Sequence, residues 1–131
     1  IEVLPARHTV PAVGFAVRGH TGWWVFSGDT ERNQPFWDRV NAMPVCYLVI
    51  ETAFSNRERE LARRSLHLSP DTLAQELAHI HPANRYPIYI THTKPSETEL
   101  IMEEIRQLDG TTGFLGPHDI RWLSAGQTLE V

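Results

Sequence analysis

The 131-residue sequence contains one cysteine, and it has no internal repeat and no low-complexity segment. Because a single thiol cannot form an internal disulfide, Cys46 favours a reducing compartment, and a cytoplasmic location is expected. No apolar run approaches the roughly 20 residues of a membrane span, so no bilayer crossing is predicted. The first residues also lack the basic and apolar regions of a secretory signal. Together these absences predict a globular protein in which Cys46 is a small buried side chain rather than a nucleophile.

An excess of positive charge is also absent. The net charge is −4 and the isoelectric point is about 5.9, which argues against a non-specific nucleic-acid binder. A small anionic substrate is still compatible with this charge, because bound metal ions can supply local positive charge. The composition, 41% hydrophobic and 21% charged, is typical of a soluble domain. A chain of this length fits one domain or part of a larger one.

Short apolar runs in the first half of the chain predict strands. Residues 13–17 and 23–27 flank the glycine-containing loop 19–22, which predicts a hairpin. A short helix is expected over 34–42, and the apolar run 45–50 predicts a buried strand.

The second half alternates helices and strands. Residues 55–64 have helical character, and a further helix is predicted to begin at an N-cap, Ser69. A strand over 88–90 follows, and Ser96 with Glu99 predicts a capping box for another helix. A terminal hairpin is expected from strands at 120–123 and 128–131. The order of these elements predicts an α/β fold with helices packed on a sheet.

Polar residues at strand ends are the natural candidates for a site. Asp29 and His92 lie there, and His8 and His67 lie in loops. Taken singly, Asp29 fits an ordinary turn residue, and each histidine fits a surface or hydrogen-bonded position. As a set, imidazoles and a carboxylate without a thiolate suit a divalent ion such as Zn²⁺, Mn²⁺ or Fe. The histidines left in the ordinary class are His20, His79, His81 and His118.

Four segments resemble metal-dependent phosphodiesterases of the metallo-β-lactamase fold, in the family's order. Residues 4–15 resemble the segment with a metal-binding histidine before a strand, here His8. Residues 26–30 are similar to the "SGDT" segment, and residues 91–95 resemble the "H-x-K-P" segment. Residues 50–56 and 67–70 together resemble a pattern of class II cyclic-nucleotide phosphodiesterases. Ribonuclease Z shares the histidine, aspartate and histidine segments in the same order.

Two departures from the family pattern stand out. The H-x-H-x-D-H signature, which supplies most metal ligands near the end of the family's N-terminal half, is absent. The resemblance therefore implies that residues 1–131 are the C-terminal part of one αββα sandwich, a single β-sheet with its flanking helices. The N-terminal half is then an expected partner, whether it was lost or is supplied by another chain. The second departure is Leu66, where the family often has glycine.

The resemblance also implies the metal ligands. His8 and His92 are each expected to bind one of two divalent metal ions, with zinc favoured and manganese or iron also fitting. Asp29 is expected to bridge the two ions through its carboxylate. The ions would lower the pKa of a bridging water towards about 7 and hold the phosphate oxygens.

Three further residues are candidates for catalysis and substrate binding. His67 is expected to be the general acid, a role that its unperturbed pKa of about 6.5 suits. Glu51 is expected to accept a hydrogen bond from His67 and fix its tautomer. Lys94 fits both a contact with substrate phosphate and an ordinary solvated lysine.

The expected function is hydrolysis of a phosphodiester, most specifically a 3′,5′-cyclic nucleotide such as cAMP or cGMP. An alternative is tRNA 3′-end processing, although the acidic chain lacks an obvious basic arm for RNA. A non-catalytic interaction module also stays open: the retained candidate residues argue against it and the missing signature argues for it. The sequence leaves open whether the chain forms a homodimer.

Overall fold

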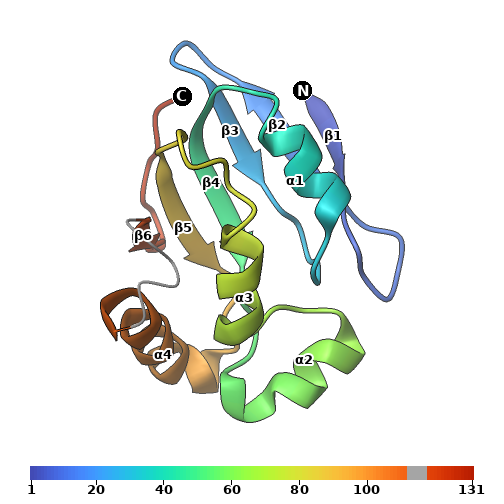
Figure 1. Ribbon diagram of the computed structural model, residues 1–131, viewed down its shortest axis with the longest axis vertical. Coiled ribbons are helices and arrows are strands. Elements are labelled where there is room, and N and C mark those ends of the chain that lie inside the picture. Colours follow the sequence, from blue (N-terminus) through green and yellow to red (C-terminus); the bar gives the residue numbers. More distant parts are fainter. Residues whose placement is uncertain (112–117) are drawn as a thin grey trace.

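The computed structural model describes residues 1–111 and 118–131, and its strands form one six-stranded sheet in the order β1-β2-β3-β4-β5-β6 (Figure 1). The pairs β1–β2 and β2–β3 are antiparallel, whereas the pairs from β3 to β6 are parallel. The carboxyl ends of β3, β4 and β5 therefore meet at the same edge of the sheet. The strands are β1 Glu2–Pro5, β2 Val13–Arg18, β3 Trp23–Phe26, β4 Val45–Glu51, β5 Pro87–Thr91 and β6 Asp119–Trp122.

Each pair of consecutive parallel strands needs a crossover connection, and helices supply it. In the part of the chain that the structure describes, one helix lies between β3 and β4, two lie between β4 and β5, and one lies between β5 and β6. The helices are α1 Gln34–Val40, α2 Arg59–Ser65, α3 Pro70–Leu77 and α4 Thr98–Thr111, with 3₁₀ turns η1 Asn56–Glu58 and η2 Pro95–Glu97. Among the described residues, none of these helices has the length and apolar character to cross a membrane.

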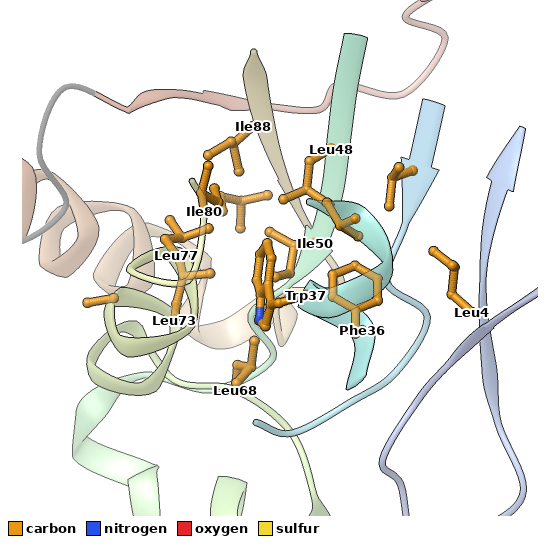
Figure 2. Close-up of a cluster of buried hydrophobic side chains, with 14 of the residues drawn as sticks. Leu4, Phe36, Trp37, Leu48, Ile50, Leu68, Leu73, Leu77, Ile80 and Ile88 are labelled. Atoms are coloured by element: carbon orange, nitrogen blue, oxygen red, sulfur yellow. The ribbon is translucent and has the colours of Figure 1, made fainter. Parts of the chain in front are cut away.

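The core lies between one face of the sheet and the helices. Alternate strand residues point to this face, as the two-residue period of a strand requires. Figure 2 shows Phe36 and Trp37 of α1 and Leu73 of α3 gathered against Leu48 and Ile50 of β4. Helix α4 joins the same cluster through Ile101 and Ile105. The helical layer thus covers one face of the sheet with a continuous apolar core.

A buried carboxylate fixes α1 to α3 within this core. Glu76 of α3 accepts hydrogen bonds from the Trp37 indole nitrogen (2.7 Å) and the Asn33 backbone amide (3.0 Å). Arg32 contacts the other carboxylate oxygen at 3.4 Å. Because Asn33 directly precedes α1, these contacts hold the start of that helix and the loop that follows β3.

The opposite face of the sheet is also apolar but only partly covered. Val3, Val13 and Phe15, all on β1 and β2, are exposed there. Further along the sheet, Trp24 and Phe26 line a cavity of about 450 Å³ together with residues of the C-terminal segment. That segment is held by the Tyr47 hydroxyl, which donates to the carbonyl of Glu130.

The predicted α/β fold and most predicted elements are confirmed. Strands β2 and β3 form the expected hairpin, in which the Gly19 amide donates to the Gly22 carbonyl at 2.8 Å. The helix predicted to begin at Ser69 has that residue as its N-cap, with Thr72 completing a capping box. The strand predicted over 45–50 is β4, buried at its end. Strand β1 was not among the predicted elements.

Two predictions near the C-terminus are wrong. The terminal hairpin does not form, because β6 pairs in parallel with β5 and residues 128–131 are not a strand. Only its turn exists, with the Gln127 amide donating to the Ser124 carbonyl. Ser96 does not cap a helix either, because it lies inside η2 and α4 begins at Thr98.

Candidate metal centre

Four candidate residues converge at the edge of the sheet where β3, β4 and β5 end. Asp29 follows β3 and His92 follows β5, so the parallel pairing brings them to the same edge. His8 comes from the connection between β1 and β2, and His67 from the loop between α2 and α3. Segments far apart in the sequence therefore supply one cluster of metal-ligating side chains.

The distances within the cluster suit a divalent ion. Nε2 of His92 lies 3.5 Å from one Asp29 oxygen, and Nε2 of His8 lies 4.0 Å from the other. The ligand atoms of Asp29, His67 and His92 all lie within 4.8 Å of one another. Two donors bound to one zinc ion at about 2.0–2.2 Å can be at most about 4.4 Å apart, so small side-chain shifts suffice. The Asp29 and His92 side chains are 42% and 52% exposed, which leaves them open to an incoming ion.

His67 and His8 each have one ring nitrogen fixed by the protein. Nδ1 of His67 lies 2.7 Å from Oε1 of Glu51, and an ionised carboxylate only accepts, so this nitrogen carries a proton. Nδ1 of His8 lies 3.1 Å from the Leu66 carbonyl and is a donor for the same reason. In each neutral ring Nε2 then has the free lone pair, which is the form that binds a metal.

Glu51 is the buried centre of this arrangement. Besides His67, its carboxylate accepts hydrogen bonds from the backbone amides of Thr30 (3.0 Å), Ala53 (3.2 Å) and Leu68 (3.2 Å). The side chain is 1% exposed. Because a buried charge is tolerated only when its oxygens are hydrogen-bonded, these donors keep Glu51 in place.

The same carboxylate changes the protonation of His67. The hydrogen bond to Glu51 raises the pKa of His67 above its ordinary value, and the charges of Glu51 and Asp29 act in the same direction. Burial of the ring opposes this shift. Because folding raises this pKa, the pair of Glu51 and His67 contributes its full stabilisation below about pH 6.5, the ordinary pKa of histidine in the unfolded chain. The stabilisation is lost as the pH rises through the pKa of His67 in the folded protein.

The backbone at the site adopts left-handed conformations. Leu66 has φ 57° and His92 has φ 61°, conformations that cost a residue with a side chain about 1–3 kcal/mol. The Leu66 conformation explains why glycine suits this position in the family that the sequence resembles. Here Leu66 takes it as the C-cap of α2, and its carbonyl faces His8.

Residue 28, next to Asp29, must be glycine because its backbone lies very close to the backbone of Val13. Its φ is +64°, and a Cβ at this position would lie 2.4 Å from the Val13 carbonyl oxygen. The neighbouring strand leaves equally little room, since a Cβ on Gly14 would lie 2.5 Å from the Phe26 carbonyl oxygen. The absence of side chains at both positions lets the Asp29 loop lie directly against β2.

Of the six candidate residues, five meet at this cluster and one does not. His67, which was expected to be a general acid rather than a metal ligand, lies close enough to Asp29 and His92 to belong to the three-residue ligand group. Lys94 is paired with Glu58 at 3.2 Å and lies over the Phe54 ring, so nothing assigns it to phosphate. The roles of His8, Asp29, Glu51, His67 and His92 stay predictions. His20, His79, His81 and His118 are not in the ligand group.

Sequence reasoning missed two buried residues that support the site. The Ser27 hydroxyl accepts a hydrogen bond from the Glu51 amide at 3.1 Å, and Oγ1 of Thr30 accepts one from the Arg7 amide at 2.9 Å. Both flank Gly28 and Asp29 in the "SGDT" segment. Their place in that segment was the available signal, because small hydroxyl residues beside a turn commonly bond to the backbone.

Comparison with known proteins supports the fold. No family model matches the chain, and no curated protein matches it. The crystal structure of the metallo-β-lactamase fold protein YhfI from Bacillus subtilis is similar, with a TM-score of 0.72 and 12% sequence identity. The match covers 95% of this chain and 47% of that chain, so this chain spans about half the length of YhfI. The metallo-β-lactamase type of α/β fold is therefore confirmed for these residues.

Replacing Gly28 by alanine should destabilise the protein and displace Asp29. The clash with Val13 adds to the cost of the left-handed backbone, so we expect the free energy of unfolding to fall by roughly 3 kcal/mol. Gly126→Ala is the matched control, because Gly126 also has positive φ but has no atom within 4 Å of the added Cβ. Its cost should be about 1 kcal/mol. Equal losses in chemical denaturation would contradict the close approach.

Replacing Glu51 by glutamine should lower the pKa of His67 in the metal-free protein. The substitution replaces the charged acceptor that raises this pKa with a neutral amide oxygen, while the burial that lowers the pKa is retained. The titration is followed by NMR of the imidazole resonances. Glu58→Gln is the control, because Glu58 pairs with Lys94 and should leave the His67 titration unchanged. An unchanged His67 pKa in Glu51→Gln would show that Glu51 does not control this proton.

Proposed function

We propose that this chain is part of a metal-dependent hydrolase that cleaves phosphodiesters. The observation that carries the proposal is the convergence of Asp29, His67 and His92, whose ligand atoms lie within 4.8 Å of one another, with His8 beside them. An imidazole and carboxylate set without thiolate suits zinc, and manganese or iron also fit. A bound divalent ion would supply a polarising charge for water and for phosphate oxygens.

The contribution of this chain's own residues centres on His67. Glu51 holds Nδ1 of the ring, so the proton that can be transferred is on Nε2, on the side of the ligand group. The raised pKa keeps a larger share of His67 protonated near neutral pH, which suits a general acid for the leaving oxygen. The same nitrogen would serve as a ligand if an ion took its lone pair. The choice between these two roles is open to direct test.

The substrate we propose is a 3′,5′-cyclic nucleotide. The support is the resemblance of residues 50–56, 67–70 and 91–95 to class II cyclic-nucleotide phosphodiesterases. The net charge of −4 argues against a large RNA substrate, because RNA binding draws mainly on phosphate contacts with basic residues.

We also propose that the site is completed by a second half of the same fold and holds two metal ions. Within the described residues there is one group of three possible ligands, and a second ion would need further donors. The apolar sheet face with exposed Val3, Val13 and Phe15 is a surface that a second sheet could cover. The match to only 47% of YhfI is consistent with a missing half.

Asp29→Ala should abolish tight metal binding by the intact enzyme together with its activity. Asp29 lies between His8 and His92, and its carboxylate faces both rings. Metal content is measured on the purified protein, and Asp38→Ala on the exposed side of α1 is the control, expected to keep its metal. If Asp29→Ala kept its metal and a near-normal rate, Asp29 would be an ordinary turn residue and the proposed function would fail.

His67→Ala should keep the metal but slow phosphodiester cleavage by about 10²–10⁴-fold, the usual contribution of a general acid. The loss should shrink for a nitrophenyl phosphodiester, because nitrophenolate departs without needing a proton. Comparing rates on a cyclic nucleotide and on the nitrophenyl ester checks this. An equal loss on both substrates, or loss of metal, would make His67 a ligand or a structural residue.

A further inference from the structure

Helix α2 places arginines beside His67. Of the 12 lysine and arginine residues only Lys94 is a lysine, and four of the remaining eleven arginines lie between positions 57 and 64. Arg59 and Arg63 are four residues apart, so they lie on the same side of α2. With Arg32 they line a cavity of about 240 Å³ that also reaches His67, and we call these three residues and this cavity the arginine pocket.

The three guanidinium groups use little of their hydrogen-bonding capacity. Arg59 contacts Asp71 through Nη1 (3.4 Å), and Arg63 contacts Glu60 through Nη2 (3.0 Å). Arg32 contacts Glu76 only through Nε (3.4 Å). A guanidinium has five N–H donors arranged to bind an oxyanion with two parallel hydrogen bonds. Each of these contacts therefore leaves most donors of its arginine without a protein acceptor among the described residues.

An arginine on the sheet shows the contrast. Arg121 engages Asp119 with both Nε (3.0 Å) and Nη2 (2.7 Å), the paired geometry of a satisfied guanidinium. The single contacts of Arg59 and Arg63 are instead with carboxylates that are 41% and 70% exposed. Exposed ion pairs of this kind are weak and are readily exchanged for a better anion.

The charge of the pocket wall also favours an anion. Its acidic members are Glu31 and Glu60, and they face three arginines and His67. Glu31 is already paired, at 3.5 Å, with Arg7, and Arg7 lies outside the pocket. Among the side chains that line the cavity, three arginines therefore outnumber two carboxylates, while Glu76 and Asp71, which contact Arg32 and Arg59, lie outside it.

We propose that the arginine pocket is a phosphate-binding subsite that works without metal. Its ligand is a phosphate group other than the one that is cleaved, supplied either as free inorganic phosphate or by a phosphodiester that carries a second phosphate; a 3′,5′-cyclic nucleotide carries only one, so with that substrate the pocket takes the free ion. The binding itself is independent of the proposed function. Its role in substrate choice rests on the proposed function, in which His67 protonates the leaving oxygen. Because His67 lines the pocket, a phosphate bound there lies on the side of the leaving group.

The test uses the intact protein treated with EDTA and titrated with inorganic phosphate. Binding is measured by calorimetry and by NMR of the arginine Nε–H resonances, at low ionic strength. We expect saturable binding with shifts at Arg32, Arg59 and Arg63. The double substitution of Arg59→Gln and Arg63→Gln should weaken binding by about tenfold or more, since charge-assisted hydrogen bonds are lost.

A matched control separates the pocket from general surface charge. Arg106 pairs with Glu103 at 2.9 Å with the same i,i+3 spacing as Arg63 and Glu60, but it lies on α4. Arg106→Gln should leave phosphate binding unchanged. Replacing Arg59 and Arg63 by lysine keeps the charge but loses the paired donors, so it should weaken binding to an intermediate degree. Amide spectra confirm that each variant is folded.

Two ligands distinguish the source of the phosphate. The dinucleotide ApA has only the linking phosphate, and its 5′-phosphorylated form has a second one. Tighter binding of the phosphorylated form than of inorganic phosphate, lost in the Arg59 and Arg63 double variant, supports a substrate phosphate. Equal binding of inorganic phosphate supports the free ion.

Absence of saturable binding, or equal weakening by Arg106→Gln, overturns the subsite. Asp29→Ala should leave phosphate binding intact, so a failed metal site would not be mistaken for a failed pocket.

Discussion

The carboxylate of Glu51, at the end of β4, ties together three segments of the candidate site, two of which carry Asp29 and His67. It accepts hydrogen bonds from Thr30 in the Asp29 loop, from Ala53 after the strand, and from His67 and Leu68 ahead of α3. Burying a carboxylate costs several kcal/mol unless its oxygens are satisfied, and four donors offset that cost. If one of the three segments moved alone, the buried carboxylate would lose a hydrogen-bond donor. Their mutual placement is a consequence of this one group.

The chemistry of the cluster follows from the same constraint. With Nδ1 of His67 held by Glu51 and Nδ1 of His8 held by the Leu66 carbonyl, both rings direct the other nitrogen away from these acceptors. The strained backbone of Leu66 is tolerated because its neighbour His67 and its own carbonyl are both fixed. Local strain of this kind persists where surrounding contacts determine the conformation. The protein's own contacts thus preorganise the site without a bound ion.

The sequence predicts the outline of this site better than its details. Asp29 and His92 were both expected at strand ends, and the contact between Glu51 and His67 was anticipated. The parallel pairing that brings the two strand ends to one edge is seen in the structure. The near approach of His67 to Asp29 was not anticipated, because it depends on contacts between segments far apart in the sequence, such as those of Glu51 with Thr30 and His67. The failed hairpin has a similar cause: residues 128–131 alternate like a strand, but β6 pairs with β5 and the C-terminal segment bonds instead to Tyr47.

The open face of the sheet and the site meet at the end of β5. Thr91 lines the apolar cavity on that face with Trp24 and Phe26, and His92 follows it directly, with a half-exposed side chain. A protein layer covering the exposed Val3 and Phe15 at the other end of this face would therefore extend towards His92 and Asp29. Such a layer would bury apolar surface and at the same time exclude water from the ligand group, where electrostatic interactions strengthen as the dielectric falls. In this geometry, a layer that covered the open face of the sheet would also enclose the candidate metal centre.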